Sequence, residues 1–208
     1  VDAYRGAGIR DVCVVRGYRK EAIDLPGLRY ADNDEHGDSG ELVSLASGLD
    51  AHDDDTMALV VSYGDVLFNR YILQILDLEE EDYVIAVDTD WQTSVNKDRA
   101  ADYVSCSEPY SRSAFYHRVL LTSAGEDLPP ETVHGEWMGF LRVSATALPE
   151  FRNIVADMLT EPGNRRAKIH HLLAELVRRD KSVRVVYTSG HWLDVDTLDD
   201  VVSAGKFA

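Results

Sequence analysis

The sequence predicts an α/β fold in which a mostly parallel mixed sheet is flanked by helices. Short apolar runs with the composition of strands alternate along the chain with stretches whose apolar residues recur at helical spacing. The 208 residues are 45% hydrophobic and 28% charged, which is the composition of a folded chain with a sizeable core. We therefore expect residues 1–208 to form a single domain that binds ligands at the carboxyl ends of its strands.

The first part of the chain alternates strand and helix in short steps. Residues 1–6 are typical of the last turns of a helix, because Gly6 and Gly8 stand where glycines commonly end helices. After this helix end we expect strands at residues 9–15, 28–31 and 57–61, and helices at residues 40–49 and 69–78.

The rest of the chain begins with strands and ends with helices. We expect strands at residues 82–87, 103–106, 118–122, 137–143 and 183–187, and helices at residues 147–159 and 166–179. In the second of these helices, five apolar residues between Ile169 and Val177 fall on one face. A last helix begins at Thr197, where Thr197 and Asp200 have the spacing of a capping box.

Charge and cysteine content exclude several classes of protein. With 21 Lys and Arg against 37 Asp and Glu, the net charge is -16, so the chain would repel nucleic acid and anionic membranes. No apolar stretch approaches the roughly 18 to 20 residues of a membrane span. Cys13 and Cys106 match no metal or redox spacing, which favours buried thiols in a reducing compartment. We expect a cytoplasmic protein that binds neither nucleic acid nor membrane.

One carboxylate has the placement of a cation ligand. The run LVVSYGD at residues 59–65 delivers Asp65 to the carboxyl end of a buried strand, directly after a glycine. Glycine lets a ligand approach the backbone closely, and carboxylate oxygens suit Mg²⁺, which keeps waters and substrate phosphates as its other ligands. An Asp at this point also caps a following helix well, so the local pattern leaves both roles open.

Two further acid pairs follow strands. Asp194 and Asp196 alternate in the run GHWLDVDT and so point to one face of an extended segment. Asp88 and Asp90 end another strand. Because the carboxyl ends of parallel strands meet at one edge of a sheet, these acids and Asp65 together predict a functional site there.

Other motifs are less specific. The run GEWMG at residues 135–139 places an acid and a large aromatic between glycines, which fits either a pocket wall or a bulge with core packing. The histidines have no metal-ligand spacing, and the adjacent His170 and His171 are expected to point to different sides of their helix. The absence of a G-x-S-x-G elbow argues against acyl transfer.

Several segments, taken in order, carry a resemblance to a known family. These are GIRDV at 8–12, VRGYR at 15–19, SL at 44–45, YGDV at 63–66, VDTDW at 87–91, GEWMG at 135–139 and WLDVDT at 192–197, followed by DD at 199–200. The chain resembles nucleotidyltransferases with a Rossmann-like, GT-A-like fold. Within them it resembles the cytidylyltransferase domains associated with phosphoenolpyruvate mutase in phosphonate and antibiotic biosynthesis.

The family opens with a glycine-rich L-A-A-G-x-G-x-R-L loop and a downstream lysine that bind the triphosphate, and the chain has no counterpart. The resemblance therefore implies a domain truncated at its amino-terminal end.

The resemblance implies a Mg²⁺-dependent enzyme that moves a nucleoside monophosphate, CMP from CTP, onto a small phosphonate or phosphate and releases pyrophosphate. Asp65 and Asp196 would be the catalytic metal ligands, with Asp194 as a third carboxylate. A phosphoenolpyruvate mutase domain, fused or separate, would be the partner.

Substrate contacts are implied in the same way. Ser44, Tyr63 and Gly64 would bind the nucleotide. The acceptor would lie against Asp90, Trp91, Glu136 and Trp137.

Two alternatives remain open from the sequence. A GT-A glycosyltransferase would use a D-x-D pair such as Asp88 and Asp90 to hold the metal of a nucleotide sugar. A relative that lacks the phosphate loop would keep the fold and have no catalytic activity.

Overall fold

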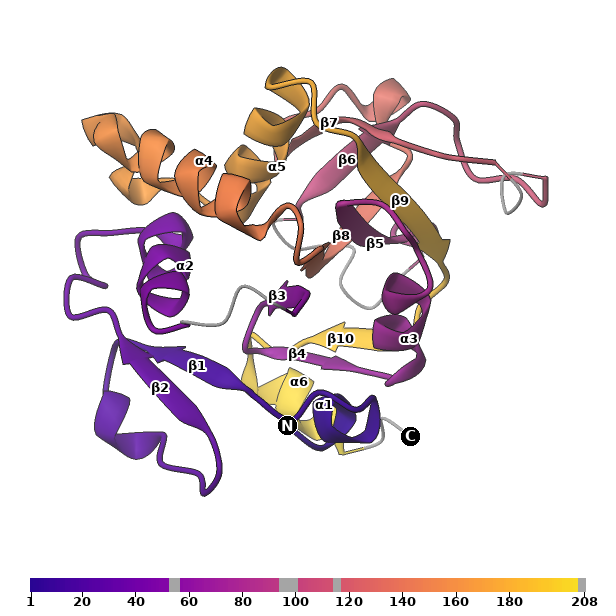
Figure 1. The fold of residues 1–208 in the computed structure, drawn as a ribbon. Helices are drawn as coiled ribbons and strands as arrows, with labels where there is room; N and C mark the ends of the chain where they lie inside the picture. Colours follow the sequence, from indigo (N-terminus) through magenta and orange to yellow (C-terminus); the bar gives the residue numbers. More distant parts are fainter. Residues whose placement is uncertain (53–56, 94–100, 114–116, 206–208) are drawn as a thin grey trace.

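A six-stranded mixed sheet forms the centre of the molecule (Figure 1). The computed structural model describes residues 1–52, 57–93, 101–113 and 117–205. Five strands of the sheet lie in the order β7-β6-β8-β5-β9, and β3 also pairs with β8. Their bounds are β3 Leu59–Ser62, β5 Tyr83–Asp88, β6 Tyr103–Cys106, β7 Leu121–Gly125, β8 Gly135–Val143 and β9 Val183–Thr188.

The sheet is flanked by helices as predicted, but most of its pairings are antiparallel. β8 runs antiparallel to β3, β5 and β6, and only β5 and β9 pair in parallel within this sheet. The expectation of a mostly parallel sheet is therefore corrected. β8 lies between β5 and β6 and runs opposite to both, in the same direction as β7, so the central pairings are antiparallel. The strands β3, β5 and β9 still share one direction, so their carboxyl ends lie at one edge.

Two short pairs of strands lie outside the central sheet. β1 (Cys13–Arg16) pairs in parallel with β2 (Arg29–Asp32), and β4 (Val66–Phe68) pairs antiparallel with β10 (Trp192–Asp194). Among the described residues, β1 pairs only with β2 and β3 only with β8, so each keeps one backbone edge without a strand partner. The 3₁₀ helices η1 (Lys20–Ala22), η3 (Pro130–Thr132) and η4 (Pro162–Arg166) lie in the connections.

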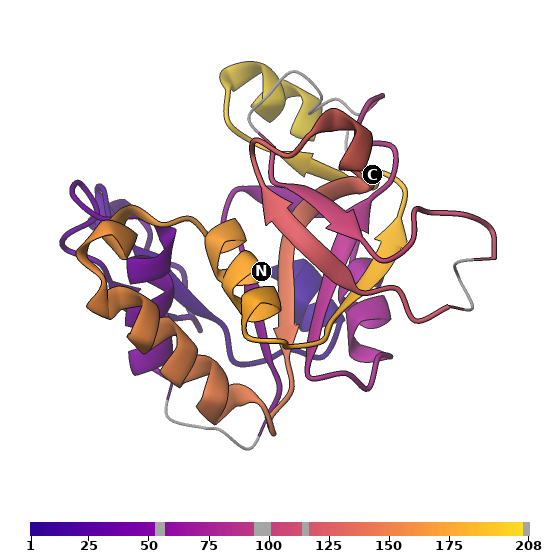
Figure 2. The same cartoon turned by 90° about the horizontal axis from the view of Figure 1, so that it is seen from above.

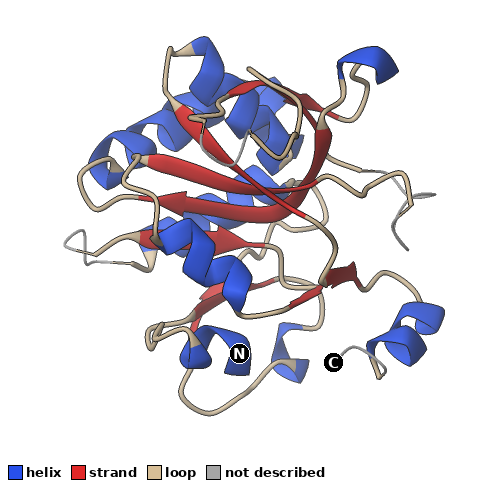
Figure 3. Cartoon of the chain, turned by 90° about the vertical axis from the view of Figure 1, so that its right-hand side faces the viewer, coloured by secondary structure: helices blue, strands red, loops and turns tan. Residues whose placement is uncertain are grey.

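Helices cover both faces of the sheet, as the views in Figure 2 and Figure 3 show. The larger core joins the sheet to α2 (Glu41–Asp50), α4 (Leu148–Thr160) and α5 (Ile169–Arg178). The smaller core, on the other face, contains α3 (Tyr71–Asp77) and residues of β4 and β10. Among the described residues, none of the helices combines the length and apolar character that a membrane span needs.

The local patterns predicted most elements within a few residues. The apolar face of α5 is buried, and the first residues form α1 (Asp2–Gly6). The strand expected at 118–122 is displaced to β7, and neither β4 nor β10 was predicted as a strand. At α6 (Leu198–Ala204), the Thr197 amide donates to Asp200 Oδ2 (2.7 Å) and the Asp200 amide donates to Thr197 Oγ1 (3.3 Å), which confirms the capping box.

A bulge in β8 explains the GEWMG run. Between the pairs Ile85–Leu141 and Val87–Trp137, β5 has one residue where β8 has three. Gly139 lies in this bulge with φ +79°, and a Cβ there would stand 2.6 Å from the ring of Tyr63. At Gly135, a Cβ would stand 2.4 Å from Val87. Of the two interpretations of this run, the structure gives the bulge with core packing.

Gly139→Ala should therefore destabilise the protein by about 3 kcal/mol, because a left-handed alanine is strained and its methyl group meets the Tyr63 ring. Urea unfolding would measure the loss. The control is Gly163→Ala, because an added Cβ there meets nothing within 4 Å. Equal stabilities of the two variants would contradict the role given to Gly139.

Candidate active site

Three carboxylates from distant parts of the sequence converge at the edge where β3, β5 and β9 end. Asp65, Asp194 and Asp196 each offer one oxygen, and these oxygens lie within 4.8 Å of one another. Asp65 and Asp196 are exposed, and Asp194 is half-buried. A group of hard oxygen donors open to solvent fits Mg²⁺, which takes few protein ligands and completes its octahedron with water and phosphate.

The pairing of β4 with β10 brings these residues together. Asp194 stands opposite Val66, and the Val195 amide donates to the Asp65 carbonyl (3.0 Å). The buried carboxylate of Asp200 accepts the Asp196 amide (3.1 Å), so the first turn of α6 fixes the backbone of Asp196. Backbone pairing on one side and a helix cap on the other therefore hold the carboxylates in place.

Asp88 is part of the supporting structure of this edge. Its side chain is fully buried (0% exposed), and its Oδ1 accepts the amides of Asp90 (2.9 Å) and Gly190 (3.0 Å). Its Oδ2 accepts the indole N–H of Trp192 (2.8 Å). Because both oxygens are engaged, Asp88 joins the end of β5 to the start of β10 and is poorly placed to share a metal with Asp90.

The residues expected to bind an acceptor divide into two groups. Asp90 is exposed and accepts a hydrogen bond from Ser189, and the half-buried Trp91 packs edge-on against Tyr103 with ring centroids 5.0 Å apart. Glu136 and Trp137, by contrast, are 5% and 2% exposed within β8.

The indole of Trp137 donates to the carbonyl of Phe140 (2.8 Å), so this ring belongs to the core. Contact of Glu136 and Trp137 with an acceptor therefore stays a prediction, and Asp90 and Trp91 are the accessible pair.

The residues expected to bind the nucleotide lie at the start of α2 and the end of β3. Ser44 is half-buried, and its Oγ accepts a hydrogen bond from Asn33 Nδ2 (3.0 Å). Tyr63 is half-buried, with its ring 5.3 Å from that of Trp137, and Gly64 is exposed. The Tyr63 hydroxyl donates to Glu41 Oε2 (2.8 Å), one helical turn before Ser44, so α2 begins beside Tyr63.

A group of polar residues around Tyr63 was not predicted. The Tyr63 hydroxyl also donates to Asp102 Oδ2 (2.9 Å), and Asp102 Oδ1 lies 2.6 Å from Nδ1 of the buried His170. Burial and the two neighbouring carboxylates raise the pKa of Tyr63 far above its usual value, so the phenol remains a donor. The rings of His170 and His171 lie 4.1 Å apart, with His170 buried and His171 exposed.

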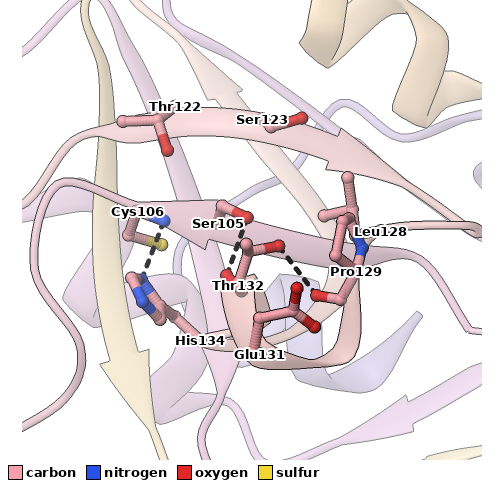
Figure 4. A pocket seen from close by; sticks show the side chains of 9 residues that line it. All are labelled: Ser105, Cys106, Thr122, Ser123, Leu128, Pro129, Glu131, Thr132 and His134. Carbon is pink, nitrogen blue, oxygen red and sulfur yellow. Dashed lines mark hydrogen bonds between the residues drawn. The ribbon is translucent and has the colours of Figure 1, made fainter.

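A separate pocket of about 490 Å³ lies between β6, β7 and the segment that precedes β8 (Figure 4). Its lining includes Cys106 and His134 but none of the predicted site residues. The Nδ1 of His134 accepts the backbone amide of Cys106 (3.0 Å). Burial raises the pKa of Cys106 to about 11, so its thiol stays protonated near neutral pH and is a poor nucleophile.

Solved nucleotidyltransferase structures resemble this fold. The inositol-1-phosphate CTP transferase from T. maritima has a TM-score of 0.71 and 14% identity, covering 95% of this chain and 75% of its own. The CTP:phosphocholine cytidylyltransferase from Streptococcus pneumoniae has a TM-score of 0.65 and 14% identity, covering 99% and 82%. A UDP-glucose pyrophosphorylase complexed with UDP-glucose has a TM-score of 0.71 and 10% identity, covering 99% and 83%.

No family model matches the sequence, and neither does any curated protein. At such low identity, the similarity to solved structures establishes the fold. The chain has the Rossmann-like fold of nucleotidyltransferases, with an acidic cluster at the strand edge.

Asp88→Asn should lower the free energy of unfolding by about 1–3 kcal/mol, because an amide NH₂ would face the indole or backbone N–H groups that the carboxylate accepts. Chemical denaturation would measure this loss. Asp90→Asn, a change of the same kind at an exposed position, is the control and should be nearly neutral. If both variants unfold like the wild type, Asp88 does not hold β10.

Proposed function

We propose that the protein is a Mg²⁺-dependent nucleotidyltransferase that moves CMP from CTP onto a small phosphonate or phosphate and releases pyrophosphate. The observation that carries this proposal is the convergence of Asp65, Asp194 and Asp196 at one edge of a nucleotidyltransferase fold. The choice of CTP is supported by the resemblance of the sequence and by the names of two structural neighbours.

Asp65 and Asp196 would hold the metal ion, with Asp194 beside them. When bound, Mg²⁺ would offset the charge that builds on the α-phosphate oxygens during transfer. An acceptor oxygen forms a bond to the α-phosphorus while the bond to pyrophosphate breaks on the opposite side. The protein would hold the metal-binding carboxylates and position the two substrates for in-line attack. The acceptor oxygen attacks directly, so no protein nucleophile is required.

Ser44, Tyr63 and Gly64 would lie at the nucleotide. Support comes from the contact between Tyr63 and Glu41, which places the start of α2 beside the loop that carries Asp65. The acceptor would lie against Asp90 and Trp91, with Glu136 and Trp137 behind them in β8. An exposed acid next to a half-buried aromatic suits an acceptor that carries a hydroxyl or amine.

We further propose that the complete domain has one more strand, between β1 and β3. The support is that each of these strands, within the described part of the chain, leaves one edge unpaired. The resemblance implies that this strand would lead into the glycine-rich triphosphate loop. It also implies a phosphoenolpyruvate mutase as the fused or separate partner.

The glycosyltransferase alternative loses support from the structure. Asp88, the first acid of its D-x-D pair, is fully buried and engaged by three N–H groups. Transfer from a nucleotide sugar, without pyrophosphate release from CTP, would restore this alternative. An absence of both activities in the full-length protein would favour the non-catalytic relative.

Asp65→Asn in the full-length protein should lower turnover about a hundredfold, because it removes a main electrostatic support of the transition state. The assay is pyrophosphate release from CTP with Mg²⁺ and a small phosphonate. Asp24→Asn, an exposed aspartate outside the acidic cluster, is the matched control and should keep full activity. Normal turnover of Asp65→Asn would refute the metal assignment.

Trp91→Ala should raise the KM for the acceptor about tenfold through loss of an aromatic contact, while the KM for CTP stays constant. Steady-state kinetics with each substrate varied in turn separate the two effects. Tyr110→Ala removes an exposed aromatic outside the predicted site, 54% exposed, and should change neither constant. A rise in the KM for CTP alone would place Trp91 at the nucleotide.

A further inference from the structure

The side chain of Tyr63 is held from several directions. Its hydroxyl donates to both Glu41 Oε2 and Asp102 Oδ2, a three-centre hydrogen bond. Its ring packs against Trp137 and against Gly139, where the glycine leaves room for it. Its amide donates to the Gly139 carbonyl (3.3 Å). Ring, hydroxyl and backbone are therefore all fixed.

The two carboxylates that bind the phenol are themselves held. Asp102 Oδ1 pairs with His170 Nδ1 at 2.6 Å, and His170 is 4% exposed. Glu41 Oε2 accepts the amide of Ile169 (2.9 Å), the first residue of α5. Tyr63 thus joins the end of β3 to the start of α2, to the start of α5 and to the residue that precedes β6.

This group is better explained as a hydrogen-bonded support than as a second metal site. Oxygen or nitrogen atoms of Asp102, Glu126 and His170 lie within 4.8 Å of one another. However, both oxygens of Asp102 are engaged by Tyr63 and His170, and the ammonium of Lys168 pairs with Glu126. The ligands that a metal would need are already committed to these partners.

Tyr63 stands at one end of the three-residue connection between β3 and β4 that carries Asp65. At the other end, the Asp65 carbonyl accepts the Val195 amide, and β4 begins at Val66. Between them Gly64 is exposed, and a Cβ there would meet nothing within 4 Å. The middle of the connection has little packing of its own, so its conformation depends on its two ends.

We propose that Tyr63, held by Asp102 and Glu41, is a positioning residue that orients Asp65 for metal binding. The inference rests on the proposed function, because it takes Asp65 as a metal ligand. Tyr63 acts through the backbone of a short connection and need not touch the substrate. Partners that orient a metal ligand in this way commonly change metal affinity or activity about 10- to 100-fold when they are removed.

The test measures Mn²⁺ binding to the full-length protein by calorimetry, without nucleotide or acceptor. Tyr63→Phe should weaken Mn²⁺ binding about tenfold, because the ring stays in place while the hydrogen bonds of the hydroxyl to Glu41 and Asp102 are lost. Asp102→Asn keeps the phenol and its bond to Glu41, and should show a smaller loss in the same direction. The control is Tyr187→Phe, which removes a hydroxyl bonded to the Glu108 carbonyl (2.6 Å) and should bind Mn²⁺ as the wild type does.

A kinetic readout separates positioning from general destabilisation. In Tyr63→Phe the KM for Mg²⁺ should rise while the KM for the acceptor stays constant, and saturating Mg²⁺ should restore turnover. If Tyr63→Phe does not fold, Asp102→Asn decides the question by the same measurements.

Wild-type Mn²⁺ affinity in a folded Tyr63→Phe variant would overturn this inference and leave the proposed function intact. Failure of the wild-type protein to bind Mn²⁺ through Asp65, shown with Asp65→Asn, would overturn both.

Discussion

The antiparallel pairing of β4 with β10 is the interaction on which the candidate site depends. It joins the connection after β3 to a segment close to the end of the described chain, through three paired positions and the contact between the Val195 amide and the Asp65 carbonyl. Like charges repel at short range, so three carboxylates do not gather unless the backbone holds them there. The pairing supplies that restraint, and the smaller core beneath it supports both strands.

The burial of Asp88 extends this restraint to the central sheet. A fully buried carboxylate is costly unless its oxygens are well satisfied, and here three N–H groups satisfy them. Two of these N–H groups belong to Gly190, just before β10, and to Trp192, the first residue of β10. The same acidic residue that looks like a metal ligand in the sequence therefore fixes the strand that carries the other candidate ligands.

The sequence was most informative where a feature depends on residues close together in the chain. The apolar spacing of α5, the capping box at Thr197 and the position of Asp65 after an apolar, half-buried strand can all be seen locally. The antiparallel direction of β8 could not be predicted, because strand composition does not fix direction. The contacts among Glu41, Tyr63, Asp102 and His170 could not be predicted either, since they join four distant segments with no shared pattern.

The unpaired edges of β1 and β3 also affect how these residues behave in solution. An exposed strand edge is a template for pairing with another chain, and neither edge has a strand over it in the described part of the molecule. The side chains of both strands are half-buried, and those of β3 are mostly apolar. These two edges are therefore places where a further strand could add to the sheet through backbone hydrogen bonds.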